Sequence, residues 1–196
     1  MENSTNANKS RVLVSRILVE PGISEFLTML YSKLPNVFLH SVDVAYLSGE
    51  VALELDLAYA DDIIRGALLH DIGKLRVPHD LLETSRKLTP EEKAVLQTHS
   101  ELGFESVRNH WYFSDIVFDI IRYHHEKQDG SGYPSGLKAL DIKKAVKIVT
   151  VCDIYDAMTR VRPYGKKYNA YEALNIMTTE PIDRSVLKIL KECPDR

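Results

Sequence analysis

Apolar residues recur every three or four positions through most of this chain, which is the spacing of a helix that buries one face. Residues 36–55 show the pattern most clearly, with apolar side chains at Val37, Val44, Leu47, Val51 and Leu55. No alternating apolar and polar run of useful length indicates a strand. The sequence therefore predicts an all-α bundle, in which helices pack on one another around an apolar core.

Length and composition are those of one globular domain. The chain has 196 residues, of which 44% are hydrophobic, and this is enough for a substantial core. We expect residues 1–20 to form a partly disordered N-terminal leader, because MENSTNANKS is polar, and residues 21–196 to form the helical domain. Neither a signal peptide nor an apolar run of about 18 residues is present, so the expected location is the cytoplasm and no membrane partner is expected.

The charge balance limits the classes of partner. The formal net charge is -3, whereas proteins that coat nucleic acid depend on clustered lysine and arginine to neutralise phosphates. A nucleic-acid polymer is therefore not an expected partner. An anionic substrate would have to be held by metal ions or by a few well-placed cations.

Histidines and aspartates stand at recurring places in the helical pattern. Five of the seven histidines fall on or at the ends of predicted helices, and these are His40, His70, His99, His124 and His125. Asp71 and Asp153 are placed in the same way. A single histidine on a helix is usually a packing residue, but imidazole and carboxylate groups together are the ligands that iron, manganese and zinc accept. Facing helices of a bundle can bring such groups to one metal centre.

Two pairs of neighbours, His70-Asp71 and His124-His125, stand at predicted helix ends. Neighbouring side chains on an ideal helix point about 100° apart, so each pair diverges and can reach two ions. The carboxylate of Asp71 can bridge two ions with its two oxygens. The pattern therefore predicts a binuclear centre of the kind that activates water for attack on a phosphate.

Four longer motifs occur in order along the chain: HDIGKLRVPHDLLE, KLTPEEKAVLQTHSELG, HHEKQDGSGYPSGL and VCDIYDAMTRVRPY. In residue type, order and spacing they resemble the HD-GYP family, a branch of the HD-domain metal-dependent phosphohydrolases. The resemblance implies an HD-domain-type helical bundle with a metal centre between helices. It also implies hydrolysis of the bacterial messenger cyclic di-GMP to the linear dinucleotide pGpG or to GMP, through hydroxide activated by two metals.

The resemblance further implies roles for individual residues. The family's ligands for one ion match His40, His70, Asp71 and Asp153, and its ligands for the other ion match Asp71, His99, His124 and His125. Asp71 is thus a catalytic residue shared by both ions. Lys74 matches the family's catalytic lysine, which contacts a phosphate oxygen of the substrate. Arg162 matches a phosphate-binding cation. Because Gly165 stands where a second one often occurs, this second contact must come from Lys166 or Lys167, or be lost.

The glycine-rich loop is expected beside the metals. The resemblance places Gly132, Tyr133 and Pro134 where they contact substrate or a signalling protein partner, since glycine lets the backbone come close. Asn36 stands where relatives with a third ion carry glutamate, so we expect two divalent ions, iron or manganese, and not three. Asp156 is expected to orient a ligand and not to bind metal itself.

Two alternatives stay open from the sequence. One is a catalytically weak or inactive HD-GYP module that acts through protein partners. The other is a phosphohydrolase for another cyclic dinucleotide or nucleotide, because base recognition depends on the shape of a pocket. The identity of the metal is open as well, since histidine and carboxylate ligands accept several first-row ions.

Overall fold

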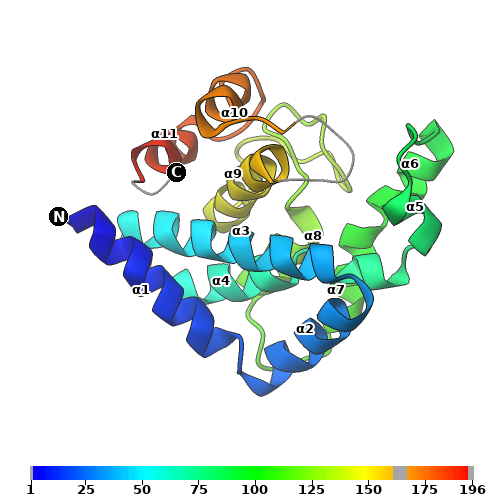
Figure 1. Ribbon diagram of the computed structural model, residues 1–196, viewed down its shortest axis with the longest axis horizontal. Helices are drawn as coiled ribbons and strands as arrows, with labels where there is room; N and C mark the ends of the chain where they lie inside the picture. Colours follow the sequence, from blue (N-terminus) through cyan, green and yellow to red (C-terminus); the bar gives the residue numbers. More distant parts are fainter. Residues whose placement is uncertain (1, 161–166, 194–196) are drawn as a thin grey trace.

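Helix α3 lies at the centre of the fold. It packs against α1 (Glu2–Ile17), α2 (Pro21–Lys33), α4 (Ala60–Leu69) and α9 (Lys144–Thr159), and itself spans Pro35–Glu54 (Figure 1). The computed structural model describes residues 2–160 and 167–193. In these residues the only β-type pairing is an isolated bridge between Asp129 and Lys138, so the predicted all-α fold class is confirmed.

Small buried side chains let the neighbouring helices approach α3 closely. They are Ser41, Ala45, Ser48, Gly49 and Ala52. The distance between two packed helices depends on the side chains at their contact, so small residues allow a close approach. The apolar periodicity that predicted this helix therefore reflects contacts with helices on more than one side.

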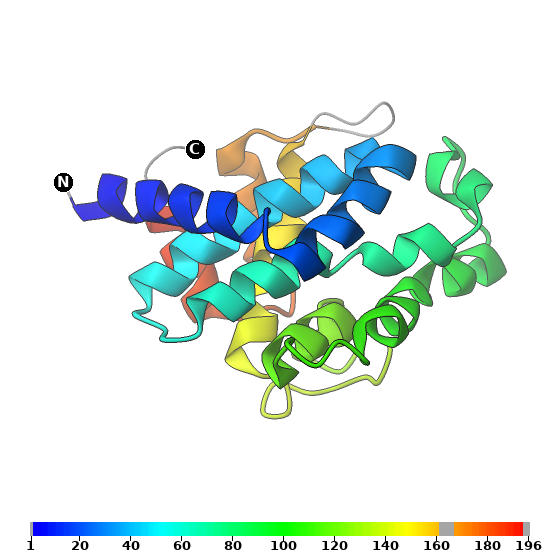
Figure 2. The same cartoon turned by 90° about the horizontal axis from the view of Figure 1, so that it is seen from below.

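The remaining elements form three groups around this centre. They are η1 (Ile72–Arg76), α5 (His79–Glu83), α6 (Pro90–Gln97), α7 (His99–Val107), α8 (Asp115–Tyr123), α10 (Ala170–Met177) and α11 (Arg184–Glu192). Helices α7 and α8 pack on η1 and α4, while α10 and α11 pack on α9. Helices α5 and α6 contain no buried residue and project from the bundle (Figures 1 and 2). Within the described part of the chain, no helix has both the length and the apolar character needed to cross a membrane.

The N-terminal segment differs from the expected disordered leader. Glu2–Ile17 form a helix that packs on α3 and α4, and its Val14 and Ile17 are fully buried. The hydroxyl of Ser10 donates a hydrogen bond to the main-chain oxygen of Tyr46 at 2.8 Å. The physical reason is that Ala7, Ser10, Val14 and Ile17 share one helical face, and burial of this narrow stripe on α3 stabilises the helix.

A close approach of η1 and α7 positions part of the site. A Cβ atom on Gly73 would lie only 1.9 Å from the main-chain oxygen of His99 and 2.5 Å from the nitrogen of Gly103. Any side chain at this position would push α7 away from η1. Gly73 thus keeps His99 next to the segment that carries Asp71.

Candidate metal centre

The predicted ligands come together at one place inside the bundle, although distant segments carry them. Their positions are His40 on α3, His70 and Asp71 after α4, His99 at the start of α7, His124 and His125 after α8, and Asp153 on α9. All except His125 are buried, with exposed fractions of 7% or less. The donor atoms of six of these seven residues form two overlapping groups in which the atoms lie within 4.8 Å of one another, and the members are Asp71, His99, His124 and His125 in one and His40, His70 and Asp71 in the other. Asp153 belongs to neither group, and its Oδ1 lies 2.9 Å from Nε2 of His40.

Asp71 belongs to both groups because its two oxygens face different histidines. Oδ1 lies 3.4 Å from Nε2 of His99 and 3.9 Å from Nε2 of His124. Oδ2 lies 3.4 Å from Nε2 of His70 and 3.9 Å from Nε2 of His40. Among the described residues, neither Oδ1 of Asp71 nor Nε2 of His70 has a hydrogen-bond partner, although both atoms are buried. Buried polar atoms without partners are costly, so this arrangement fits a cation between them.

Main-chain carbonyls orient three of the imidazoles. In each ring Nδ1 donates a hydrogen bond to the carbonyl oxygen three residues earlier. The pairs are His70 and Ala67 (2.7 Å), His99 and Leu96 (2.8 Å), and His124 and Ile121 (3.0 Å). A carbonyl oxygen only accepts, so in a neutral ring Nδ1 carries the proton and Nε2 presents a lone pair. The Nε2 atoms of His99 and His124 lie 3.3 Å apart. Burial lowers the pKa of His99 and brings that of His124 well below 6.5, so both rings are neutral.

Side chains orient the ring of His40 instead. Its Nδ1 lies 2.6 Å from Oδ2 of Asp156, and its Nε2 lies 2.9 Å from Oδ1 of Asp153. Burial alone would lower the pKa of His40, but the hydrogen bonds to these two carboxylates raise it to about 9. The surroundings of this ring therefore stabilise positive charge, which a metal cation on Nε2 would also supply. Asp156 contacts the ring on the side away from Asp71, as expected of an orienting residue.

Lys74 is the cation nearest to the shared carboxylate among the described residues. Its Nζ lies 2.5 Å from Oδ2 of Asp71. Burial alone would raise the pKa of Asp71, but the charge of Lys74 and the contact with His70 keep it well below its usual range. The side chain of Lys74 is 22% exposed, so its ammonium group lies between the buried carboxylate and solvent.

The glycine-rich loop lies against the most exposed histidine of the cluster. The side chain of His125 is 27% exposed, and the ring of Tyr133 lies 4.7 Å from its ring and 6.3 Å from that of His99. Tyr133 and Pro134 are half-buried, and burial raises the pKa of the Tyr133 hydroxyl. A Cβ on Gly132 would lie 2.5 Å from the main-chain oxygen of His125, so the backbone folds back onto the segment that carries His125 only because this residue is glycine.

Glu126 holds this loop, a role that the sequence did not predict. Its side chain is buried, with 1% exposed, and its two oxygens accept hydrogen bonds from the main-chain nitrogens of Ser135 (2.6 Å) and Leu137 (2.9 Å). Thr150 supports the same segment, since its hydroxyl donates to the main-chain oxygen of His124 at 2.8 Å. A glutamate four residues before the first glycine of the turn was the available signal, because the free N–H groups of such a turn need acceptors.

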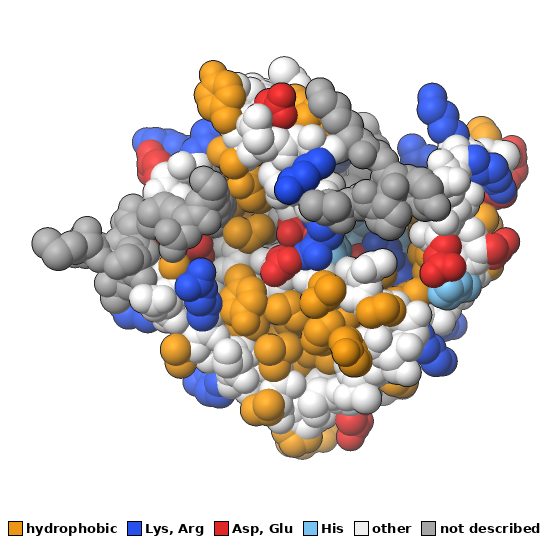
Figure 3. Space-filling view, viewed as in Figure 1, with side chains coloured by type: hydrophobic (Ala, Val, Ile, Leu, Met, Phe, Trp, Pro, Cys, Tyr) orange, Lys and Arg blue, Asp and Glu red, His pale blue; other side chains and the backbone are white. Residues whose placement is uncertain are grey.

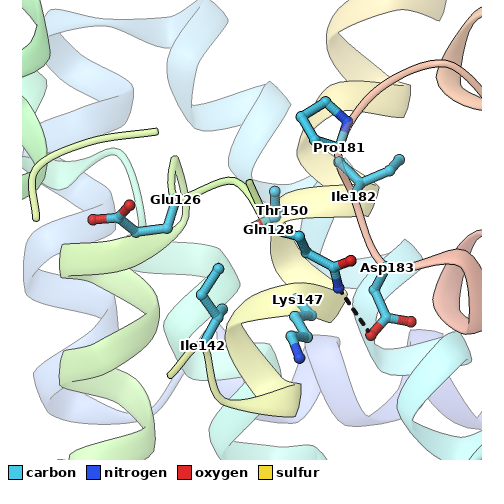
Figure 4. Close-up of a pocket in the computed structure, with 8 residues that line it drawn as sticks. All are labelled: Glu126, Gln128, Ile142, Lys147, Thr150, Pro181, Ile182 and Asp183. Atoms are coloured by element: carbon cyan, nitrogen blue, oxygen red, sulfur yellow. Dashed lines mark hydrogen bonds between the residues drawn. The ribbon is translucent and has the colours of Figure 1, made fainter. Parts of the chain in front are cut away.

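A cavity next to the segment that carries Glu126 is too small for a nucleotide. Its volume is about 10 Å³, and Thr150, Asp183 and Glu126 are among its lining residues (Figure 4). That volume holds about one water molecule. Gln128 closes one side, because its Nε2 donates to Oδ2 of Asp183 at 3.4 Å and its main-chain nitrogen donates to the oxygen of Pro181 at 2.8 Å. The cavity therefore marks where the loop segment is fastened to the connection between α10 and α11.

One face of the molecule gives access to the cluster. Histidine atoms show there between acidic and basic side chains in a hollow, with apolar side chains beside it (Figure 3). Asn36 is exposed in the first turn of α3. The predicted phosphate-binding residues Arg162 and Lys166 lie outside the described residues, so their roles stay predictions, and Lys167 is exposed.

The fold and the cluster together define the class of protein: an all-helical domain with a His/Asp cluster able to hold metal. The HD domain family matches residues 26–185, which is most of the chain, and the protein therefore belongs to this family. The matched range contains all seven predicted metal ligands. The resemblance to the HD-GYP branch of this family is confirmed.

Comparison with known proteins finds similar chains in several bacteria. A cyclic di-GMP phosphodiesterase of Pseudomonas aeruginosa is 37% identical over 165 residues, which cover 82% of this chain and 39% of that protein. A 3′3′-cGAMP-specific phosphodiesterase of Vibrio cholerae is 34% identical over 151 residues, covering 76% and 35% respectively. The chain thus spans well under half the length of these curated relatives.

A solved structure shows the same fold. An HDG"Y"P protein from Bdellovibrio bacteriovorus superposes with a TM-score of 0.69 at 22% identity, over 97% of this chain and 62% of that one. The superposition includes the N-terminal helix α1, which lies outside the residues that the HD domain family matches.

Proposed function

We propose that this protein is a metal-dependent phosphodiesterase that hydrolyses cyclic di-GMP to pGpG, to GMP or to both. The observation that carries the proposal is the placement of Asp71, whose two oxygens face separate groups of histidines while Lys74 contacts it from the solvent side. The names of the curated relatives support a cyclic dinucleotide as substrate.

Two divalent cations fit the donor atoms. One would be held by His40, His70, Asp71 and Asp153, and the other by Asp71, His99, His124 and His125. Imidazole and carboxylate groups suit iron or manganese, and the amide of Asn36 is a poor ligand for a third ion. When bound, such a pair lowers the pKa of a water molecule and offsets the charge that develops on an attacked phosphate.

The protein's own residues prepare the site for an anionic substrate. The buried imidazoles of His99 and His124 are neutral and point their Nε2 lone pairs inward, so no proton has to leave them first. Lys74 is close enough to solvent to contact a non-bridging phosphate oxygen, and it would stabilise the charge that grows there during attack. We further propose that Arg162 and Lys166 hold the phosphates. Tyr133, with its neighbours Gly132 and Pro134, would form one wall of the opening beside His125.

A product assay tests the proposal. The protein, loaded anaerobically with Fe(II) or Mn(II), is incubated separately with cyclic di-GMP, 3′3′-cGAMP and p-nitrophenyl phosphate, and the products are separated by chromatography. We expect cyclic di-GMP to be opened fastest, with pGpG or GMP as product. Metal-loaded protein that leaves all three compounds intact would contradict the proposed activity.

A second substrate is supported by one observation. The Vibrio cholerae relative named for 3′3′-cGAMP is nearly as similar to this chain as the relative named for cyclic di-GMP. If 3′3′-cGAMP is hydrolysed faster than cyclic di-GMP in the same assay, the proposed substrate changes to 3′3′-cGAMP and the proposed reaction stays the same. A signalling partner at the Gly132-Tyr133-Pro134 loop and a cytoplasmic location stay predictions, which pull-down and cell fractionation test.

A further inference from the structure

We infer that Arg160 is a positioning residue that holds His40 in its metal-binding orientation by acting through Asp156. This inference rests on the metal centre of the proposed function. Arg160 follows the last residue of α9, four residues beyond the end of the DIYD segment that contains Asp153 and Asp156. Its guanidinium group extends from there to α3, the helix that carries His40.

The contacts of Arg160 surround His40. Its Nε donates to Oδ2 of Asp156 at 2.8 Å, and this is the same oxygen that lies 2.6 Å from Nδ1 of His40. Its Nη2 donates to the main-chain oxygen of Leu39 at 3.1 Å and to the carboxylate of Asp43. Leu39 directly precedes His40, and Asp43 lies one helical turn after it. Arg160 therefore fixes both the carboxylate that orients the ring and the turn of α3 that carries it.

The charges explain why an arginine is needed here. Three carboxylates, those of Asp43, Asp153 and Asp156, gather around His40, and Arg160 contacts two of them. Their mutual repulsion would drive Asp43 and Asp156 apart if this cation were lost. A guanidinium group offers several donors in a fixed plane, so one side chain can hold two carboxylates and a carbonyl at once. An ammonium group keeps the charge but not this geometry.

The effect should be limited to one of the two ions. His70, His99 and His124 are each oriented by a main-chain carbonyl three residues earlier in the chain, and none of these carbonyls contacts Arg160. Outer partners of metal-bound histidines typically change metal affinity by roughly 10- to 100-fold when they are removed. We therefore expect loss of Arg160 to weaken the ion at His40 and to leave the ion at His99 and His124 in place.

The test uses the full chain with Arg160→Gln, stripped of metal and titrated with Mn(II) in a calorimeter. Wild-type protein should bind two equivalents, whereas the variant should bind one normally and the second roughly 10- to 100-fold more weakly. Electron paramagnetic resonance provides a second readout, because the signal of two coupled Mn(II) ions should give way to that of a single ion. Arg160→Lys should restore part of the lost affinity.

Arg65 offers a matched control. Its side chain is 21% exposed against 20% for Arg160, and it also bonds two carboxylates, those of Glu20 and Asp62. Arg65→Gln should lower the melting temperature as a structural ion pair would, and it should leave Mn(II) binding unchanged. If Arg160→Gln does not fold, the inference is tested by the affinity of Arg160→Lys for the second Mn(II). An affinity equal to that of the wild-type protein overturns the inference.

The outcomes separate this inference from the proposed function. Wild-type protein that binds no Mn(II) would overturn the metal centre and the inference with it. Wild-type protein and Arg160→Gln that both bind two equivalents with equal affinity would overturn the inference alone. A variant that loses both ions equally would also contradict it, because Arg160 would then support the fold and not the orientation of His40.

Discussion

The two sides of the His/Asp cluster are built differently. On the α7–α8 side, defined by His99, His124 and His125, two of the three imidazoles are oriented by main-chain carbonyls. On the α3–α9 side, defined by His40 and Asp153, the imidazole is oriented by the side chain of Asp156. A substitution cannot remove a carbonyl, but it can remove a carboxylate. We therefore expect the two sides to respond differently to mutation, although Asp71 joins them.

The largest effect is expected where the two sides meet. Asp71→Asn removes the negative charge that both groups of histidines face. Both ions should be lost and turnover should fall to background, because each ion loses a charged ligand. Elemental analysis of the purified variant and the product assay with cyclic di-GMP check this. Hydrolysis at the wild-type rate would show that Asp71 does not hold the reacting centre.

Lys74→Ala should separate metal binding from turnover. The ammonium group contacts Asp71 and is partly exposed, while the imidazoles do not depend on it for their orientation. Both ions should stay bound, and kcat should fall roughly 10²- to 10³-fold with a smaller change in KM, as for removal of a group that stabilises transition-state charge. Steady-state kinetics with metal content measured on the same sample provides the check. A loss of metal equal to the loss of rate would assign Lys74 to the metal centre instead.

Asp156→Asn tests the α3–α9 side. The amide oxygen can still accept the proton of His40 Nδ1, but it carries no charge, so the ring becomes a weaker donor to a cation. We expect about 10-fold weaker binding of one Mn(II) equivalent and an unchanged second equivalent. Calorimetric titration measures both. Equal weakening of the two ions would remove the distinction between the sides.

The smallest effect is expected on the α7–α8 side. Thr150→Val removes the hydroxyl that donates to the main-chain oxygen of His124, at a cost of about 1 kcal/mol in the free energy of unfolding. Metal binding should not change, because Nδ1 of His124 keeps its carbonyl partners. Denaturant unfolding and Mn(II) titration are the two measurements. A marked loss of metal affinity here would mean that main-chain carbonyls do not protect this side.

The sequence did not predict the roles of two residues that hold other parts of the site in place by hydrogen bonds. The roles of Glu126 and Arg160 depend on partners that lie elsewhere in the fold: Glu126 bonds Ser135 and Leu137, and Arg160 bonds Leu39 and Asp43. Helix α1 was missed for a related reason, since its apolar stripe is narrow and becomes stable only against α3.

Helical periodicity and motif spacing are local properties of the chain, so the helical class, the family and the residue types of the His/Asp cluster could be predicted without a structure. The folded molecule was needed to learn which oxygen of Asp71 faces which histidines, which ring nitrogens present lone pairs, and what holds His40. The type of a side chain limits the chemistry that it can do. The direction in which it points depends on hydrogen bonds with its neighbours, and for His40 these come from another helix.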